Sequence, residues 1–126
     1  MVEVLKVIII SNDSINENMA GPGIRYFNFA CELSNHFEII LFTPNVCRLK
    51  TKFQTVQFSK KLLRDYSKEA KCIILQGTVL WNNPFIKKLN IPLVIDLYDP
   101  FFLEEMETNS ERAYKNYMHR STLSII

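Results

Sequence analysis

The sequence predicts an α/β domain built on an open, mostly parallel sheet with helices on both faces. Short runs of apolar, β-branched residues recur along the chain, as in strands buried on both faces. Segments with helical spacing alternate with these runs, which favours strand–helix–strand units. The 126 residues match the length of one domain, so we expect one core spanning residues 1–126.

The apolar runs define the expected strands. The clearest covers residues 4–10, where Val and Ile dominate. The full set of expected strands is residues 4–10, 37–42, 53–58, 72–75 and 92–97.

The first helix is expected from Ile24, where the apolar spacing becomes 3.6. Tyr26 and Ala30 then share one side while Arg25 lies on the other, and Asn35 suits a left-handed helix end. Further helices are expected over residues 60–71 after the capping Ser59, over residues 84–89 from Pro84 to the terminating Asn90, and over part of residues 101–117.

Composition excludes several classes of protein. Lys and Arg total 15 against 13 Asp and Glu, so we expect no nucleic-acid partner. The three cysteines form no C-x-x-C motif, and neither a metal nor a cofactor is expected. The first apolar run is too short to span a membrane and lacks a cleavage site, so we expect a cytoplasmic protein. The basic run at residues 60–64 leaves two interpretations open, a solvated face or contact with the inner face of the membrane.

Ligands of open parallel sheets bind beyond the carboxyl ends of the strands. Three segments are expected there, residues 12–23, 77–83 and 96–100. Gly21-Pro22-Gly23 precedes the first helix, where small residues and free N–H groups favour phosphate and Arg25 could add a charged hydrogen bond. The alternative is a plain turn that caps the helix.

A nicotinamide-dinucleotide site is disfavoured. That site requires G-x-G-x-x-G directly after the first strand and an acidic residue ending the second. Here the loop is long, the third glycine is missing, and Thr43-Pro44-Asn45 ends the second strand.

Two separated motifs resemble the N-terminal half of GT-B glycosyltransferases of the family-4 (group 1) type. The first runs from Met19-Ala20-Gly21-Pro22-Gly23-Ile24-Arg25-Tyr26 through the following helix and strand. The second is Asp96-Leu97-Tyr98-Asp99-Pro100 with the trailing Glu104. The resemblance covers nearly the whole chain and implies a Rossmann-like, acceptor-side domain of a two-domain enzyme.

The resemblance implies roles for individual residues. Gly21, Pro22 and Gly23 would approach the donor phosphates, with Arg25 as a helper. Asp96, Tyr98 and Asp99 would line the cleft near the transferred sugar as candidate catalytic residues, in a region where many relatives carry a histidine.

Alternatives stand beside several of these roles. Asp96 could be a satisfied strand-end carboxylate, and Asp99 could cap the next helix. Trp81 and Glu104 would lie on the acceptor side; helix packing is the alternative for Trp81, and a solvated helix face for Glu104.

The resemblance implies a retaining transfer of a sugar from a nucleotide-sugar co-substrate to a glycan, lipid or small-molecule hydroxyl. The donor-binding glutamate motif of such enzymes is absent from the 126 residues. We therefore expect the chain to be inactive by itself. It would need a C-terminal donor-binding domain, which is either a separate chain or a part missing from this sequence. The apolar residues 123–126 read as the start of a strand, so a truncated domain is expected. The alternative function is a non-enzymatic remnant, or a Rossmann-like module that binds a phosphate-bearing ligand.

Overall fold

The computed structural model describes residues 4–97, which contain a five-stranded sheet in the order β3-β2-β1-β4-β5. Every neighbouring pair of strands is parallel. The strands are β1 (Lys6–Ile10), β2 (Glu38–Thr43), β3 (Gln54–Gln57), β4 (Cys72–Gln76) and β5 (Leu93–Asp96). The predicted Rossmann-like α/β architecture is confirmed, and each predicted strand is present with its ends shifted by one or two residues.

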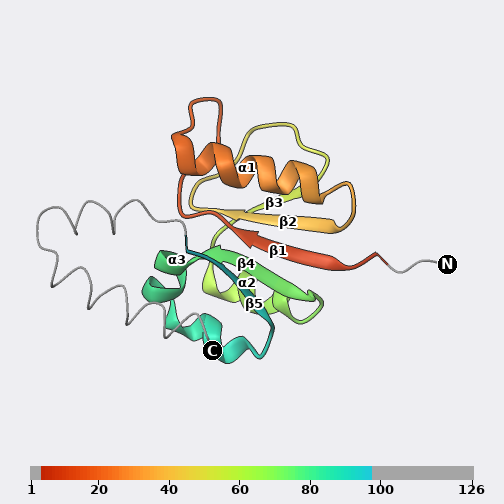
Figure 1. Ribbon diagram of the computed structural model, residues 1–126, viewed down its shortest axis with the longest axis vertical. Helices are drawn as coiled ribbons and strands as arrows, with labels where there is room; N and C mark the ends of the chain where they lie inside the picture. Colours follow the sequence, from red (N-terminus) through yellow and green to blue (C-terminus); the bar gives the residue numbers. More distant parts are fainter. Residues whose placement is uncertain (1–3, 98–126) are drawn as a thin grey trace, which may run out of the picture.

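Helices cover both faces of this sheet, as predicted. The helix α1 (Gly21–Leu33) lies on one face, and α2 (Lys60–Ser67) and α3 (Gly77–Asn82) lie on the other (Figure 1). A 3-10 helix, η1 (Pro84–Leu89), follows α3 on that second face. The chain builds outward from β1 to β3 and then returns to the other side of β1, and this crossover carries α2 to the face opposite α1.

The alternation of side chains along β1 divides the core into two halves. Val7 and Ile9 pack in the cluster under α1, while Ile8 and Ile10 pack in the cluster under α2 and α3. All four side chains are at most 5% exposed. A strand buried on both faces is what a continuous apolar run predicts.

Two expectations about α1 were wrong. The helix α1 starts at Gly21, three residues before Ile24, because Pro22 suits the first helical turn and Ala20 already has an extended backbone. Its end is not left-handed at Asn35, since the chain leaves α1 through Ser34 in a right-handed conformation. Within the described part of the chain, the one non-glycine residue with positive φ is Asn90, at 60°, which ends η1 as predicted.

Tertiary contacts account for two further differences between the expected and the observed helices. The helix α2 ends at Ser67 instead of residue 71, and Lys71 N–H donates to the Lys6 carbonyl as the chain joins the sheet. Residues 77–82, expected to project as an open segment, form α3, because Val79 and Leu80 are buried in the core.

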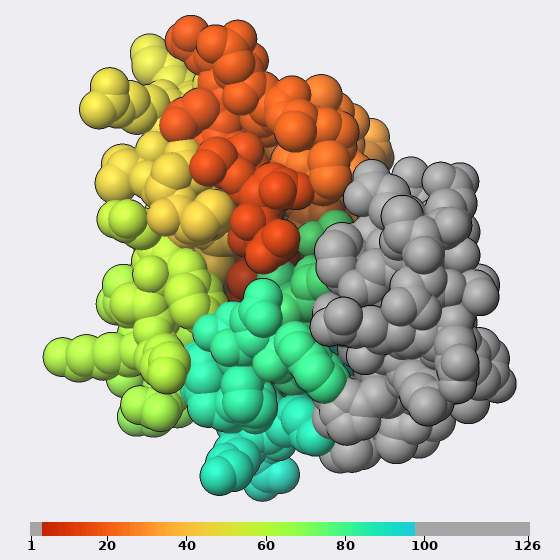
Figure 2. Space-filling view, turned by 90° about the vertical axis from the view of Figure 1, so that its left-hand side faces the viewer, coloured from red at the N-terminus to blue at the C-terminus, as the bar shows by residue number. Residues whose placement is uncertain are grey.

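Figure 2 looks onto the carboxyl edge of the sheet. The segment between β1 and α1 (red to orange) crosses the middle of this face, with the connection from β2 to β3 (yellow) beside it and η1 (teal) below. This edge therefore gathers the segments that follow β1, β2 and β4.

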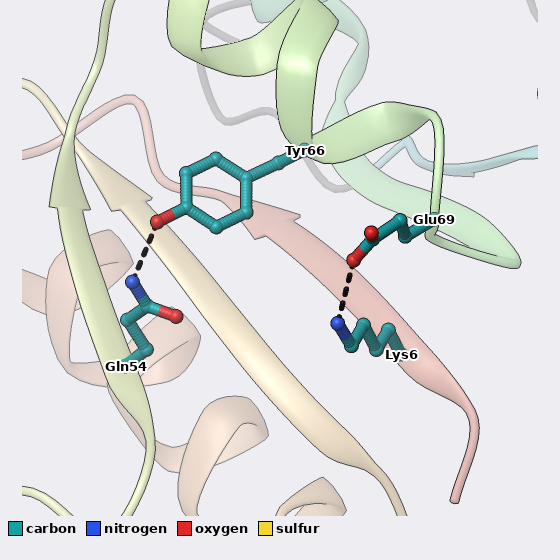
Figure 3. Close-up of polar contacts among 4 residues, drawn as sticks. All are labelled: Lys6, Gln54, Tyr66 and Glu69. Atoms are coloured by element: carbon teal, nitrogen blue, oxygen red, sulfur yellow. Dashed lines mark hydrogen bonds and ion pairs between the residues drawn. The ribbon is translucent and has the colours of Figure 1, made fainter.

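Away from this edge, two polar contacts tie α2 and the turn after it to the sheet (Figure 3). Gln54 Nε2 donates to Tyr66 Oη at 2.6 Å, and Lys6 Nζ lies 2.7 Å from Glu69 Oε2. Among the helices of residues 4–97, none is long and apolar enough to cross a membrane.

Candidate functional site

The topological switch point of the sheet lies between β1 and β4. These two strands are neighbours, yet the chain leaves β1 toward α1 on one face and leaves β4 toward α3 on the other. The carboxyl ends of the two strands therefore lie at the position where open α/β sheets bind their ligands.

The first turn of α1 stands at this edge. Gly21, Pro22 and Gly23 form that turn, and Ala20, the N-cap residue, supplies no side-chain capping bond. The first N–H to bond within the helix belongs to Ile24, which donates to the Ala20 carbonyl at 3.0 Å. Because Pro22 has no N–H, Gly21 and Gly23 are the residues of this turn whose backbone N–H groups have no acceptor within the helix.

The two glycines differ in their surroundings. A Cβ added to Gly21 would meet no atom within 4 Å, so this position faces open space. A Cβ on Gly23 would lie 3.0 Å from the Ser14 carbonyl oxygen and 3.6 Å from Met19 Cβ. The absence of a side chain at Gly23 therefore allows the β1–α1 loop to pack closely against it. Gly21 is the glycine that a ligand can approach.

The β1–α1 loop is held down by one side chain from the next connection. Ile15 N–H donates to Asn45 Oδ1 at 3.0 Å, and Asn45 Nδ2 donates to the Ile15 carbonyl at 3.2 Å. The Ile15 side chain is fully buried. The loop that covers Gly23 is thus a fixed part of the edge.

Asp96 brings α1 and β5 together. Its Oδ2 forms an ion pair with Arg25 Nη1 and accepts a hydrogen bond from Tyr26 Oη at 3.0 Å. The Arg25 guanidinium also lies 4.9 Å from the centre of the Phe29 ring. The Asp96 carboxylate therefore has two partners on α1, the Arg25 guanidinium and the Tyr26 hydroxyl.

The environment of Tyr26 keeps its hydroxyl protonated. The side chain is 1% exposed. Burial is the largest cause that raises its pKa above the ordinary value, and the charge and hydrogen bond of Asp96 add to it. Tyr26 thus acts as a fixed donor to Asp96.

Next to this cluster, α1, β4 and β5 line an open hollow of about 430 Å³. The lining residues are Arg25, Phe29, Glu32 and Leu33 of α1, Ile74 of β4, and Val94 and Asp96 of β5. The walls are mostly apolar and the polar groups few, as in sites for small organic ligands.

Of the remaining predicted site residues, Trp81 is the one that the structure describes, and it lies away from this cluster. Trp81 lies on α3, on the opposite face from α1, and is 40% exposed, so it is not a core residue. Tyr98, Asp99 and Glu104 lie outside the described residues. Within residues 4–97, no group of three His, Cys, Asp or Glu side chains is placed to hold a metal ion.

Sequence reasoning missed Gln76, Tyr26 and Asn45 as polar groups of this edge. Gln76 carried a signal, since it is the one polar residue that closes the apolar run of β4. Tyr26 was assigned only to the apolar side of α1, and its hydroxyl partner is 70 positions away. Nothing local in the sequence indicates that contact.

Comparisons of the chain with protein-family models, with curated proteins and with solved structures find no match.

Proposed function

We propose that this chain is the acceptor-binding half of a glycosyltransferase that uses a nucleotide-sugar donor. The observation that carries the proposal is the first turn of α1. It has no side-chain cap, it carries Gly21 in open space, and it stands at the switch point of a parallel sheet. Phosphate groups bind at helix starts of this kind because N–H groups and the helix dipole favour negative charge. The resemblance of the two sequence motifs to family-4 transferases supports the same reading.

The turn acts on the leaving group in this proposal. When the bond to the transferred sugar breaks, the diphosphate leaves with the electron pair and gains negative charge. Backbone N–H groups fixed in the helix stabilise that charge without having to reorganise. Arg25 is engaged with Asp96, so in this proposal the N–H of the exposed Gly21 supplies most of the attraction at this turn.

Transfer in this proposal needs a donor-binding half that faces the same edge. The glutamate pair with which related enzymes hold the donor is absent from the 126 residues. This chain would supply the acceptor site and the turn of α1, and a separate or contiguous Rossmann half would supply the donor site.

We also propose a cytoplasmic location with peripheral contact at anionic membrane surfaces. Lys60, Lys61, Leu62 and Arg64 are all exposed at the start of α2. An exposed basic helix with an apolar residue among the charges is attracted to anionic headgroups. Binding to vesicles with and without phosphatidylserine tests this contact.

The direct test starts with purification of the chain from its source together with any donor-binding partner. Turnover of nucleotide sugars by that complex is then measured for Gly21→Arg and for the control Gly21→Ala. We expect the arginine side chain to fill the approach to the turn and abolish transfer, and the alanine variant to keep it. Transfer that survives Gly21→Arg contradicts the role of the turn.

A second measurement separates the enzyme from a phosphate-binding module. Nucleotide sugars are titrated against the isolated chain. Tight binding without a second half contradicts the proposed division of labour and favours the module.

A further inference from the structure

The strands at the two edges of the described sheet differ in composition. At one edge, β3 reads Gln-Thr-Val-Gln, and its Gln54 side chain donates to Tyr66 of α2. At the other edge, β5 reads Leu-Val-Ile-Asp, with three aliphatic residues in succession. Aliphatic runs are typical of parallel strands that have neighbours on both sides. β5 therefore stands at an edge with the composition of an interior strand.

The backbone of β5 faces β4 and the outer edge at alternate residues. On the inner side, the Ile73 N–H of β4 donates to the Pro92 carbonyl at 3.0 Å. The N–H and C=O groups of successive residues point to opposite sides of a strand, so Val94 faces β4 as Pro92 does. Leu93 and Ile95 then point away from β4, and within residues 4–97 no strand pairs with that side.

The outer side of β5 lacks the features that discourage pairing at an edge. Proline can block an edge strand because it has no N–H, but Pro92 faces β4, so the donors of Leu93 and Ile95 remain on the outer side. The Val94 side chain is 51% exposed, and those of Leu93 and Ile95 are only partly buried in the cluster under α2 and α3. A further strand and its connection would bury this aliphatic surface and pair the outer backbone groups.

The sequence beyond the described residues contains an apolar run that suits this edge, at residues 123–126. Residues 98–122 separate the run from β5, which is more than the dozen or so residues that a parallel crossover needs. Part of that connection, within residues 101–117, has helical spacing. A right-handed crossover from β5 would pass over the face of α3, as the connection from β4 to β5 does, and would cover Leu93 and Ile95 there.

We infer that the outer edge of β5 is a strand-pairing surface, and that residues 123–126 of this chain occupy it as a sixth parallel strand. The inference is independent of the proposed function, because it rests on the edge of the sheet and not on the turn of α1. It accounts for the aliphatic composition of β5 and gives partners to the outward backbone groups of Leu93 and Ile95.

The first test is NMR on the unmodified 126-residue chain. Neighbouring strands bring backbone protons close together, so we expect nuclear Overhauser contacts between residues 93–96 and residues 123–126. The amide protons of Leu93 and Ile95 should exchange with solvent at least about tenfold more slowly than in an unstructured chain, as that of Val94 should. Absence of the contacts, or exchange of Leu93 and Ile95 at the unstructured rate, overturns the inference.

The second test removes backbone donors from the run by Ser124→Pro and, separately, by Ile125→Pro. Successive residues of a strand face opposite sides, so one of these two N–H groups points at β5. That variant should speed exchange at Leu93 and Ile95 by at least about tenfold and leave the rate at Val94 unchanged, because Val94 faces β4. The control Ser121→Pro lies outside the run and should leave all three rates unchanged. Slow exchange at Leu93 and Ile95 in both run variants overturns the inference.

Dilution of the unmodified chain identifies the occupant of the edge. Pairing within one chain does not depend on protein concentration, whereas pairing between two copies weakens on dilution. We expect the exchange rates at Leu93 and Ile95 to stay constant across a concentration series. Rates that rise on dilution would show that a second copy occupies the edge, and this overturns the assignment to residues 123–126.

Discussion

Arg25 of α1 and Asp96 of β5 form an ion pair across 71 positions of sequence. Tyr26 donates to the same carboxylate oxygen, so two consecutive residues of α1 reach the end of one strand. The Asp96 side chain is 13% exposed and that of Arg25 is 36% exposed, so water screens the pair only in part. These contacts tie the first turns of α1, which packs over β1 and β2, to the end of β5.

Asp96→Asn should lower the free energy of unfolding by about 1–3 kcal/mol, because it leaves the part-buried Arg25 without its counter-charge. Urea denaturation measures the change. Glu69→Gln is the matched control, since its ion pair with Lys6 is exposed to solvent and should contribute less than the Arg25–Asp96 pair. Equal small effects for both variants would show that the Arg25–Asp96 pair contributes no more than a surface pair.

Tyr26 should make stability fall at high pH. Burial raises its pKa in the folded chain above the ordinary value of about 10. The folded state therefore holds its proton where the unfolded state releases it. The stabilisation is complete below about pH 10 and is lost as the pH rises above it. Free energies of unfolding measured between pH 8 and 11 should decline less steeply for Tyr26→Phe than for the unmodified chain, and parallel curves would contradict the raised pKa.

Alanine substitutions should separate the two glycines of the first turn. Gly23→Ala places a Cβ 3.0 Å from the Ser14 carbonyl oxygen and should destabilise the fold by about 1–3 kcal/mol. Gly21→Ala meets open space and should stabilise by up to about 1 kcal/mol, because alanine loses less backbone entropy on folding. Chemical denaturation measures the free energy of unfolding of the two variants. Equal changes for both would contradict the packing of the loop on Gly23.

Asn45→Ala should release the β1–α1 loop. It removes both hydrogen bonds to Ile15 and should cost about 1–3 kcal/mol. Amide hydrogen exchange should become faster at Ile15, whose N–H loses its acceptor. Asn18→Ala, an exposed position in the same loop, is the control and should leave the exchange rate at Ile15 unchanged. An unchanged rate in Asn45→Ala would contradict the anchoring role.

The strands and the layers could be predicted from the sequence because burial leaves a local pattern. The run that became β1 is apolar on both faces, and the strand is buried on both faces. Asn90 ends η1 as predicted, since asparagine tolerates a left-handed backbone. The start of α1 was misplaced because Gly21 and Gly23 weaken the helical pattern, although Pro22 fits the first turn.

The sequence by itself determined which segments form the strands, α1, α2 and η1, and that the glycine turn follows the first strand, but it did not determine α3. Only the tertiary structure decided which of the polar residues meet. The strand order places β4 between β1 and β5, so Gln76 comes to lie beside Asp96, and Asp96 beneath Arg25 and Tyr26. Periodicity records whether a residue is buried, but the partner of a buried polar group depends on which strands become neighbours. The order of the strands depends on the packing of the whole sheet. It therefore cannot be predicted from the residues next to either of the two polar groups that meet.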